Sequence, residues 1–166
     1  MRYVALFTTL ILLAGLGGCA GLFAPPPQPG EPLAAVTAKL GRPGAVHQVE
    51  GDSVLEYASA PYGQTTYMAR IGADGRLKSY EQVLTSEKFG SIKVGKATKQ
   101  DVLRIIGHPA ETAYLSLSDL EVWSYRYKES GAWDSMMHVH FDRAGIVRMM
   151  MNGPDPLHEE RRGFFR

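Results

Sequence analysis

The chain has 166 residues, with 18 Lys and Arg against 17 Asp and Glu. Apolar residues make up 45% of the sequence, which is enough to form a packed core, and the length suits one ordinary domain or two small ones. A formal charge of +1 gives no global field that would attract nucleic acid or anionic lipid. The composition therefore gives no support to nucleic-acid binding.

Residues 1–19 have the pattern of a secretory signal that ends on the only cysteine in the sequence. Arg2 is the one early charge, residues 3–16 form an apolar run, and residues 16–19 read Leu-Gly-Gly-Cys. The apolar run is too short to span a bilayer. The alternative is an ordinary signal peptide, cleaved after Gly18 or Ala20, in which Cys19 is incidental.

The Leu-Gly-Gly-Cys run resembles a bacterial lipobox. The resemblance implies that a lipoprotein signal peptide, residues 1–18, is removed, that Cys19 carries diacylglycerol on its sulfur, and that its new amino terminus is acylated by a fatty acid such as palmitate. Three acyl chains hold a protein durably at a membrane, because each buried methylene contributes about 0.8 kcal/mol. Ala20 lacks the acidic side chain that implies inner-membrane retention, so we expect the outer membrane. An exported chain with one acylated cysteine has no disulfide and depends on apolar burial.

The segment after Cys19 is rich in proline. Residues 19–32 contain Pro25, Pro26, Pro27, Pro29 and Pro32. Such a composition favours an extended spacer over a packed element. We expect residues 19–32 to act as a tether between the acylated cysteine and the folded body.

Beyond the tether the sequence repeats a set of landmarks. Residues 40–43, Leu-Gly-Arg-Pro, recur as Ile-Gly-His-Pro at residues 106–109, and each run closes a segment with apolar residues at helical spacing. Thr98 with Asp101 three positions on predicts a capped start for the second helix. Chance is the alternative explanation, because Gly-x-Pro after a helix is common.

Short strand patterns follow each helical segment. Residues 55–57, Leu-Glu-Tyr, correspond to Trp-Ser-Tyr at residues 123–125, and Gly75 and Gly145 mark hairpin turns. The sequence therefore predicts an α+β fold of two tandem units, each a short helical segment packed on a three- to four-stranded antiparallel sheet.

The predicted boundaries divide the chain after the tether into three parts. Residues 33–86 form the first unit, residues 87–153 the second, and residues 154–166 a flexible basic and aromatic tail. The second unit begins with a short helical turn, in which Phe89 and Ile92 are expected to make apolar contacts.

Part of the sequence resembles the SmpA/OmlA (BamE) outer-membrane lipoprotein domain. The resemblance is carried by residues 92–103, 106–109, 123–125 and 141–147. It covers residues 90–152 well and residues 30–85 as a degenerate second copy. It implies a small α+β domain at the periplasmic face of the outer membrane that supports the insertion of β-barrel proteins. Tandem copies also resemble the β-lactamase-inhibitor-protein architecture, in which two repeats build one concave sheet that grips a partner.

The sequence contains none of the motifs that carry common catalytic chemistry. Gly-x-Ser-x-Gly, a phosphate-binding glycine loop and His-Glu-x-x-His are all absent, so no catalytic residue is expected. His138 and His140 share one face of a predicted strand, but no third ligand completes a metal site, and no metal or cofactor is expected. Carboxylates such as Asp52 and Glu56 fall at positions expected to face water. A small envelope hydrolase remains the least favoured alternative.

The aromatic residues divide into packing and binding candidates. Trp123, Tyr125 and Tyr127 share one strand phase and are expected to pack against the helices. Trp133, beside a loop glycine, and Tyr62, in the corresponding loop of the first unit, are expected to face outward as partner-binding residues. His138 and His140 are expected to be a solvent-facing or partner-facing pair, whose affinity for a partner weakens below about pH 6.5.

Together these patterns predict a non-catalytic binding or scaffold component of envelope biogenesis, with outer-membrane β-barrel assembly as the leading role. The expected partners are membrane lipid, through Cys19, and a protein of the outer membrane or periplasm. A periplasmic protein inhibitor or ligand-binding module, using a concave sheet, is the alternative.

Overall fold

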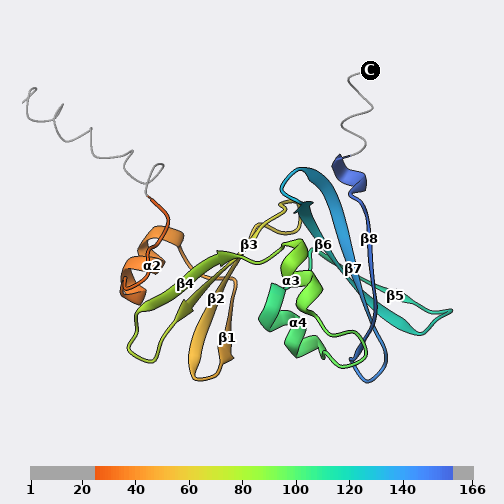
Figure 1. Cartoon of the computed structure of the whole chain (residues 1–166), viewed down its shortest axis with the longest axis horizontal. Coiled ribbons are helices and arrows are strands. Elements are labelled where there is room, and N and C mark those ends of the chain that lie inside the picture. Colours follow the sequence, from red (N-terminus) through yellow and green to blue (C-terminus); the bar gives the residue numbers. More distant parts are fainter. Residues whose placement is uncertain (1–24, 159–166) are drawn as a thin grey trace, which may run out of the picture.

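The computed structural model describes residues 25–158, which fold into two four-stranded antiparallel sheets accompanied by short helices (Figure 1). This arrangement confirms the predicted α+β class. The signal, Cys19 and residues 159–166 lie outside the described residues. In chain order the elements are α2 (Leu33–Leu40), β1 (Ala45–Val49), β2 (Asp52–Ala58), β3 (Thr66–Ile71), β4 (Leu77–Gln82), α3 (Ser86–Ser91), α4 (Lys99–Ile106), β5 (Glu111–Leu115), β6 (Leu120–Glu129), β7 (Trp133–Phe141) and β8 (Val147–Pro154).

The first unit packs α2 on one face of the sheet β1-β2-β3-β4. Helix α2 follows Pro32, whose extended backbone suits an N-cap although no side chain caps the helix, and it ends at Gly41 with a φ of 79°. Val36 on α2 is fully buried and packs in one core with four apolar residues of the sheet. These are Leu55, Ala69, Ile71 and Leu77.

The second unit packs α3 and α4 on the sheet β5-β6-β7-β8. Helix α4 begins with the predicted capping box, in which Thr98 and Asp101 exchange side-chain and backbone hydrogen bonds. The predicted helix-facing aromatics Trp123, Tyr125 and Tyr127 are all buried in this core. Phe89 of α3 meets Tyr127 edge-on with ring centroids 4.8 Å apart, and Ile92 is also buried, as expected.

In each unit a tyrosine of the sheet forms a hydrogen bond with the glycine at the end of the helix, and the two bonds are equivalent. The Tyr57 hydroxyl donates to the carbonyl oxygen of Gly41 at 3.4 Å, and the Tyr125 hydroxyl donates to that of Gly107 at 3.1 Å. Gly41 and Gly107 end their helices with φ values of 79° and 80°. Glycine adopts this backbone conformation at no steric cost, which explains why both helices stop at the Gly-x-Pro landmark.

The starts of the helices and the ends of the hairpins correspond as well. Pro32, just before α2, bridges to Arg76, and Thr98, just before α4, bridges to Ile146. Each third strand also carries a register irregularity immediately before its hairpin turn, at Arg70/Ile71 in β3 and at His140/Phe141 in β7. The fold therefore contains two tandem sheet units built in the same way.

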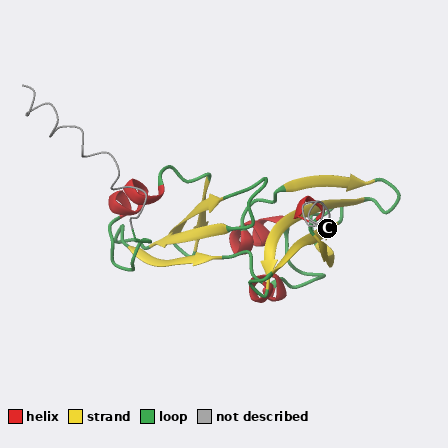
Figure 2. Cartoon of the chain, turned by 90° about the horizontal axis from the view of Figure 1, so that it is seen from above, coloured by secondary structure: helices red, strands yellow, loops and turns green. Residues whose placement is uncertain are grey.

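Helix α4 lies between the two sheets (Figures 1 and 2). The face of the first sheet that is turned away from α2 carries Val54 and Met68, which form a second buried cluster with Val83, the residue after β4. This face and the α4 residues Arg104 and Ile105 line the same cavity of about 260 Å³. The described strands form two separate sheets, not the single concave sheet of the inhibitor architecture.

The ends of the folded body differ from the predicted boundaries. Part of the tether is docked, since Gly30 donates its N–H to the carbonyl of Leu77 at 2.8 Å and accepts a hydrogen bond from Arg76 at 2.8 Å. The predicted flexible tail starts too early at residue 154, because Asp155 is completely buried. The reason is long-range: its carboxylate pairs with Arg126 in β6. Within the described residues, no helix is long and apolar enough to cross a membrane.

Candidate binding site at the Trp133 end of the second sheet

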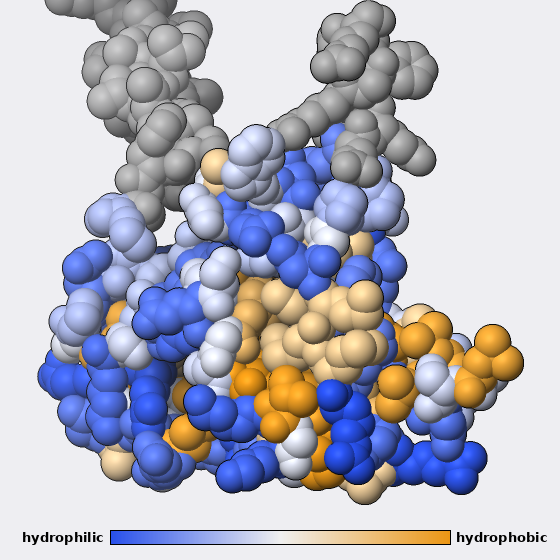
Figure 3. Space-filling view, turned by 45° about the vertical axis from the view of Figure 1, so that its right-hand side comes forward, coloured by the Kyte–Doolittle hydropathy of each residue, from blue (hydrophilic) through white to orange (hydrophobic). Residues whose placement is uncertain are grey.

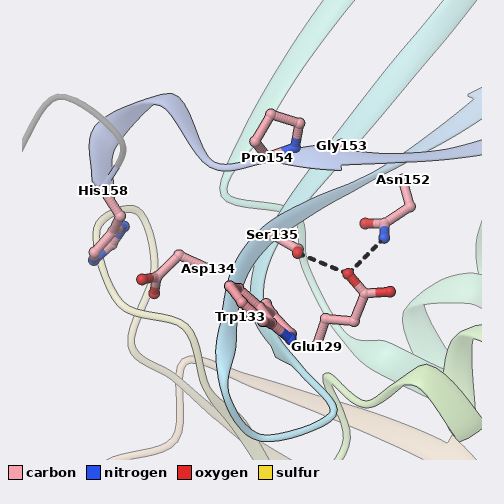
Figure 4. A pocket seen from close by; sticks show the side chains of 8 residues that line it. All are labelled: Glu129, Trp133, Asp134, Ser135, Asn152, Gly153, Pro154 and His158. Atoms are coloured by element: carbon pink, nitrogen blue, oxygen red, sulfur yellow. Dashed lines mark hydrogen bonds between the residues drawn. The ribbon is translucent and has the colours of Figure 1, made fainter. Parts of the chain in front are cut away.

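A cavity of about 420 Å³ lies at the end of the second sheet where β6 turns into β7 (Figure 4). It is lined by Glu129, Trp133, Asp134, Ser135, Asn152, Gly153, Pro154 and His158. Glu129 accepts hydrogen bonds from the Ser135 hydroxyl and the Asn152 amide, both at 2.9 Å, and Figure 4 shows both bonds. These bonds join three strands and fix the cavity wall.

Trp133 is the exposed aromatic of this cavity. It is the first residue of β7 rather than a loop residue as predicted, and 62% of its surface is accessible. A large aromatic held by a strand loses little conformational freedom on binding, so this position suits a protein contact.

The loop of the first unit that carries Tyr62 reaches the same end of the second sheet. Arg126 of β6 donates from Nε to the carbonyl oxygen of Pro61 at 3.1 Å, and Gln64 donates to a carboxylate oxygen of Asp134 at 2.9 Å. Tyr62 itself is 75% exposed. The structure thus brings together the two loop regions that the sequence singled out separately.

Arg126 organises this junction from within the fold. Its side chain is buried, and its guanidinium pairs with the carboxylates of Asp155 and Glu111. His158 also contacts Asp155, with Nδ1 2.8 Å from a carboxylate oxygen. A buried guanidinium needs such partners because burial without compensation is costly. One side chain therefore holds the Tyr62 loop and the chain segment beside the cavity.

His138 and His140 lie elsewhere, on the face of the second sheet turned away from its helices. His138 is half-buried with Nδ1 2.8 Å from the Ser124 hydroxyl, and burial, with His140 nearby, lowers its pKa. His140 is 5% exposed, so it does not face solvent as one of the two predicted alternatives required. On this face the register pairs His140 with Met149 and His138 with Met151, so each histidine has a methionine as its neighbour on the next strand.

Two further exposed apolar surfaces lie outside the candidate site residues predicted from the sequence. The β5–β6 hairpin projects from the body (Figures 1 and 2) and presents Tyr114, Leu115 and the fully exposed Leu117. Figure 3 shows apolar side chains gathered near the middle of one face. Among the apolar residues at the surface, Val94 is 51% exposed and lines a hollow of about 400 Å³ with Met137 and Met150. Leu115 and Leu117, two apolar residues at a turn, were the feature of the sequence that could have indicated an exposed hairpin.

Two carboxylates that the sequence analysis predicted to face water are buried in the structure. Asp52 and Glu56 are 4% and 2% exposed. Asp52 pairs with Arg70 and Lys78 in the first sheet. Glu56 contacts His47 of β1 and His108, which follows α4. Burial acts to raise the pKa of Glu56, but hydrogen bonds from both histidines outweigh it, and the pKa lies below its ordinary value.

Comparison with known families decides how the second unit is to be classified. Residues 81–151 match the family model described as the outer membrane protein assembly factor BamE domain. This part of the chain is therefore similar to a BamE domain. It contains all of α3, α4 and β5–β7 and most of β8, and so includes Trp133 and His108 but not Tyr62 or Glu56.

Other comparisons add little to the BamE-like match. No curated protein matches the chain. A crystal structure of YjgB, a DUF4309 family protein of Bacillus subtilis, aligns over 72% of this chain and 74% of its own at 14% identity, with a TM-score of 0.28. That TM-score carries no argument about the fold or the function.

Proposed function

We propose that this protein is a lipid-anchored, non-catalytic docking component of outer-membrane protein assembly. The observation that carries the proposal is the BamE-like domain at residues 81–151, whose family is one of outer-membrane assembly factors. Its location is then the periplasmic face of the outer membrane, with Cys19 as the acylated residue. The absence of catalytic motifs from the sequence agrees with a binding role.

The proposed docking surface consists of Tyr62, Trp133 and the cavity beside Trp133. The two aromatic side chains come from different units, are exposed, and sit on segments held by Arg126 and Asp134. Aromatic anchors on a pre-formed support are the residues that dominate protein interfaces. The partner is a protein of the outer membrane or periplasm.

Site-specific photocrosslinking in intact cells tests this surface. A photoreactive amino acid is placed at position 62 or 133, and at position 46 as a control, because Val46 is also exposed but lies on the far edge strand β1. We expect positions 62 and 133 to crosslink to a subunit of the barrel-assembly machinery and position 46 not to do so. Equal crosslinking at all three positions, or none at 62 and 133, would contradict the docking surface.

The lipid anchor is tested independently of the partner. Cells are labelled with radioactive palmitate, and the protein is compared with a Cys19→Ser variant. We expect label and outer-membrane fractionation only with Cys19. An unlabelled wild-type protein that fractionates with the soluble periplasm, and crosslinks there to a soluble protein, would instead support an inhibitor or ligand-binding module.

We infer further that the first unit, residues 33–86, is a divergent copy of the BamE-like domain. The inference is supported by the equivalent helix ends at Gly41 and Gly107 and by the equivalent bridges at Pro32 and Thr98. An experimental structure in which one helix and four strands of each unit fail to superpose would contradict it.

A further inference from the structure

A cluster of three metal-binding side chains lies where the first unit meets the second. His47 Nε2 is 2.8 Å from Glu56 Oε2, and His108 Nδ1 is 2.9 Å from the same oxygen. One ligand atom from each of the three residues lies within 4.8 Å of the others. The backbone N–H of His108 also donates to Glu56 Oε1 at 2.9 Å, which orients the carboxylate.

We propose that His47, Glu56 and His108 bind a divalent cation of the zinc type. Two imidazoles and one carboxylate form a ligand set that zinc uses in proteins, with a fourth position left for water or another ligand. The hydrogen-bond distances in the cluster are a few tenths of an ångström shorter than the separation of ligands around a tetrahedral ion. Binding therefore requires the Glu56 oxygen to move away from both imidazoles, and the two ring nitrogens, which lie within 4.8 Å of each other, to take up a tetrahedral separation.

The burial of the three residues suits such a site. The side chains of His47 and Glu56 are 6% and 3% exposed, which holds two ligands in fixed positions. The His108 side chain is 54% exposed, so it can move and gives the ion a route from solvent. Each imidazole presents a lone pair at the ligating nitrogen once its proton occupies the other ring nitrogen.

The ligand set is not a by-product of the repeated fold. The register pairs Ala45 with Glu56 in the first unit and Glu111 with Ser124 in the second, so Ser124 occupies the position equivalent to Glu56. By the same correspondence Ala113 stands where the first unit has His47. The three ligands meet only because His108 of the second unit packs against the first sheet. A bound ion would therefore hold the two units in one orientation.

Metal titration of the full-length protein in detergent, purified without a histidine tag and stripped with a chelator, tests the proposal. Zn²⁺ binding is followed by calorimetry, and Co²⁺ binding by the visible absorption of the ion. We expect one ion per chain with tetrahedral Co²⁺ bands, and a loss of at least about tenfold in affinity in His108→Ala. His108 is exposed, so this variant is expected to stay folded, which circular dichroism checks.

The matched control removes the other histidine pair. A His138→Ala/His140→Ala double variant, also checked for folding, is expected to bind Zn²⁺ as the wild type does, because neither residue belongs to the cluster. Wild-type protein without stoichiometric binding, unchanged affinity in His108→Ala, or loss of binding in the double variant would each overturn the proposal. The metal titration does not depend on the crosslinking experiment. One result can therefore contradict the metal site without contradicting the docking role, and the reverse also holds.

Discussion

Glu56 of the first unit accepts two hydrogen bonds from His108 of the second, one from the backbone N–H and one from Nδ1, each at 2.9 Å. The glycine before His108 leaves room for this contact, because a Cβ atom on Gly107 would lie 2.8 Å from the Glu56 carboxylate and would displace it. The pair thus joins residues 52 positions apart at a point where two sheets share one helix.

Replacing Glu56 with alanine is expected to destabilise the protein. The variant removes the hydrogen-bond partner of the buried His47 side chain and of the His108 backbone N–H. Removing one member of a buried pair costs about 3 kcal/mol. Urea unfolding measures the change in the free energy of unfolding. Glu81→Ala is the control, since Glu81 makes an exposed ion pair with Lys88 and its loss costs less than about 1 kcal/mol. Equal midpoints for the two variants would contradict the prediction.

Loss of the cap on α4 is expected to weaken the second unit. Thr98→Ala removes the oxygen that accepts the Asp101 N–H, and capping residues of this kind contribute about 1 kcal/mol. Thermal unfolding monitored by circular dichroism measures the effect. Thr98→Ser keeps an accepting oxygen and is expected to retain most of the stability. If serine and alanine are equally harmful, the hydrogen bond is not the cause.

Stability is expected to fall in acid partly through Asp52. Hydrogen bonds from Lys78 and Arg70 lower the pKa of its carboxyl from 3.8. A carboxyl with a lowered folded-state pKa stabilises the protein above its unfolded-state pKa, and this contribution is lost as the pH falls through the folded-state value. Asp52→Asn is therefore expected to unfold at a lower temperature at neutral pH. The difference in unfolding temperature between the variant and the wild type should become smaller below about pH 4. A difference that does not change with pH would show that the Asp52 carboxylate is not the group responsible.

Trp133 is expected to matter for binding and not for folding. Because 62% of its surface is accessible, Trp133→Ala should change the free energy of unfolding by less than about 0.5 kcal/mol. Loss of an aromatic anchor commonly costs about 2 kcal/mol of binding, or roughly 30-fold in affinity. Co-purification from solubilised membranes measures the second effect, with Leu117→Ala as a control at a fully exposed position on the β5–β6 hairpin. A lower free energy of unfolding in Trp133→Ala, with as much partner co-purified as with the wild type, would show that Trp133 serves folding and not binding.

The features that the sequence predicted are those determined by near neighbours in the chain. The capping box at Thr98, the helix ends at Gly41 and Gly107 and the hairpin turns at Gly75 and Gly145 each depend on a few adjacent residues. Strand phase likewise predicted that Trp123, Tyr125 and Tyr127 lie in the core, because side chains alternate between the two faces of a sheet.

The features that the sequence missed depend on packing between distant segments. Glu56 is expected in water from its strand position, and only the approach of His108 buries it. Asp155 follows a proline and a glycine that suggest a free tail, yet it pairs with Arg126, 29 positions away. Neither contact has a local signal, since the partners are far apart in the sequence and meet only when the segments between them have folded.

Helix α4 has an evolutionary consequence, because it packs on the second sheet and also lies beside the face of the first sheet that α2 leaves uncovered. If the halves arose from one ancestor, they are free to diverge in loops and surface residues, but the first half cannot be kept without the second. A first half inherited by itself would carry Val54, Met68 and Val83 into water with nothing to shield them. Selection therefore keeps the first half together with the second, and a lineage that kept only the first half would need a new hydrophilic face on it.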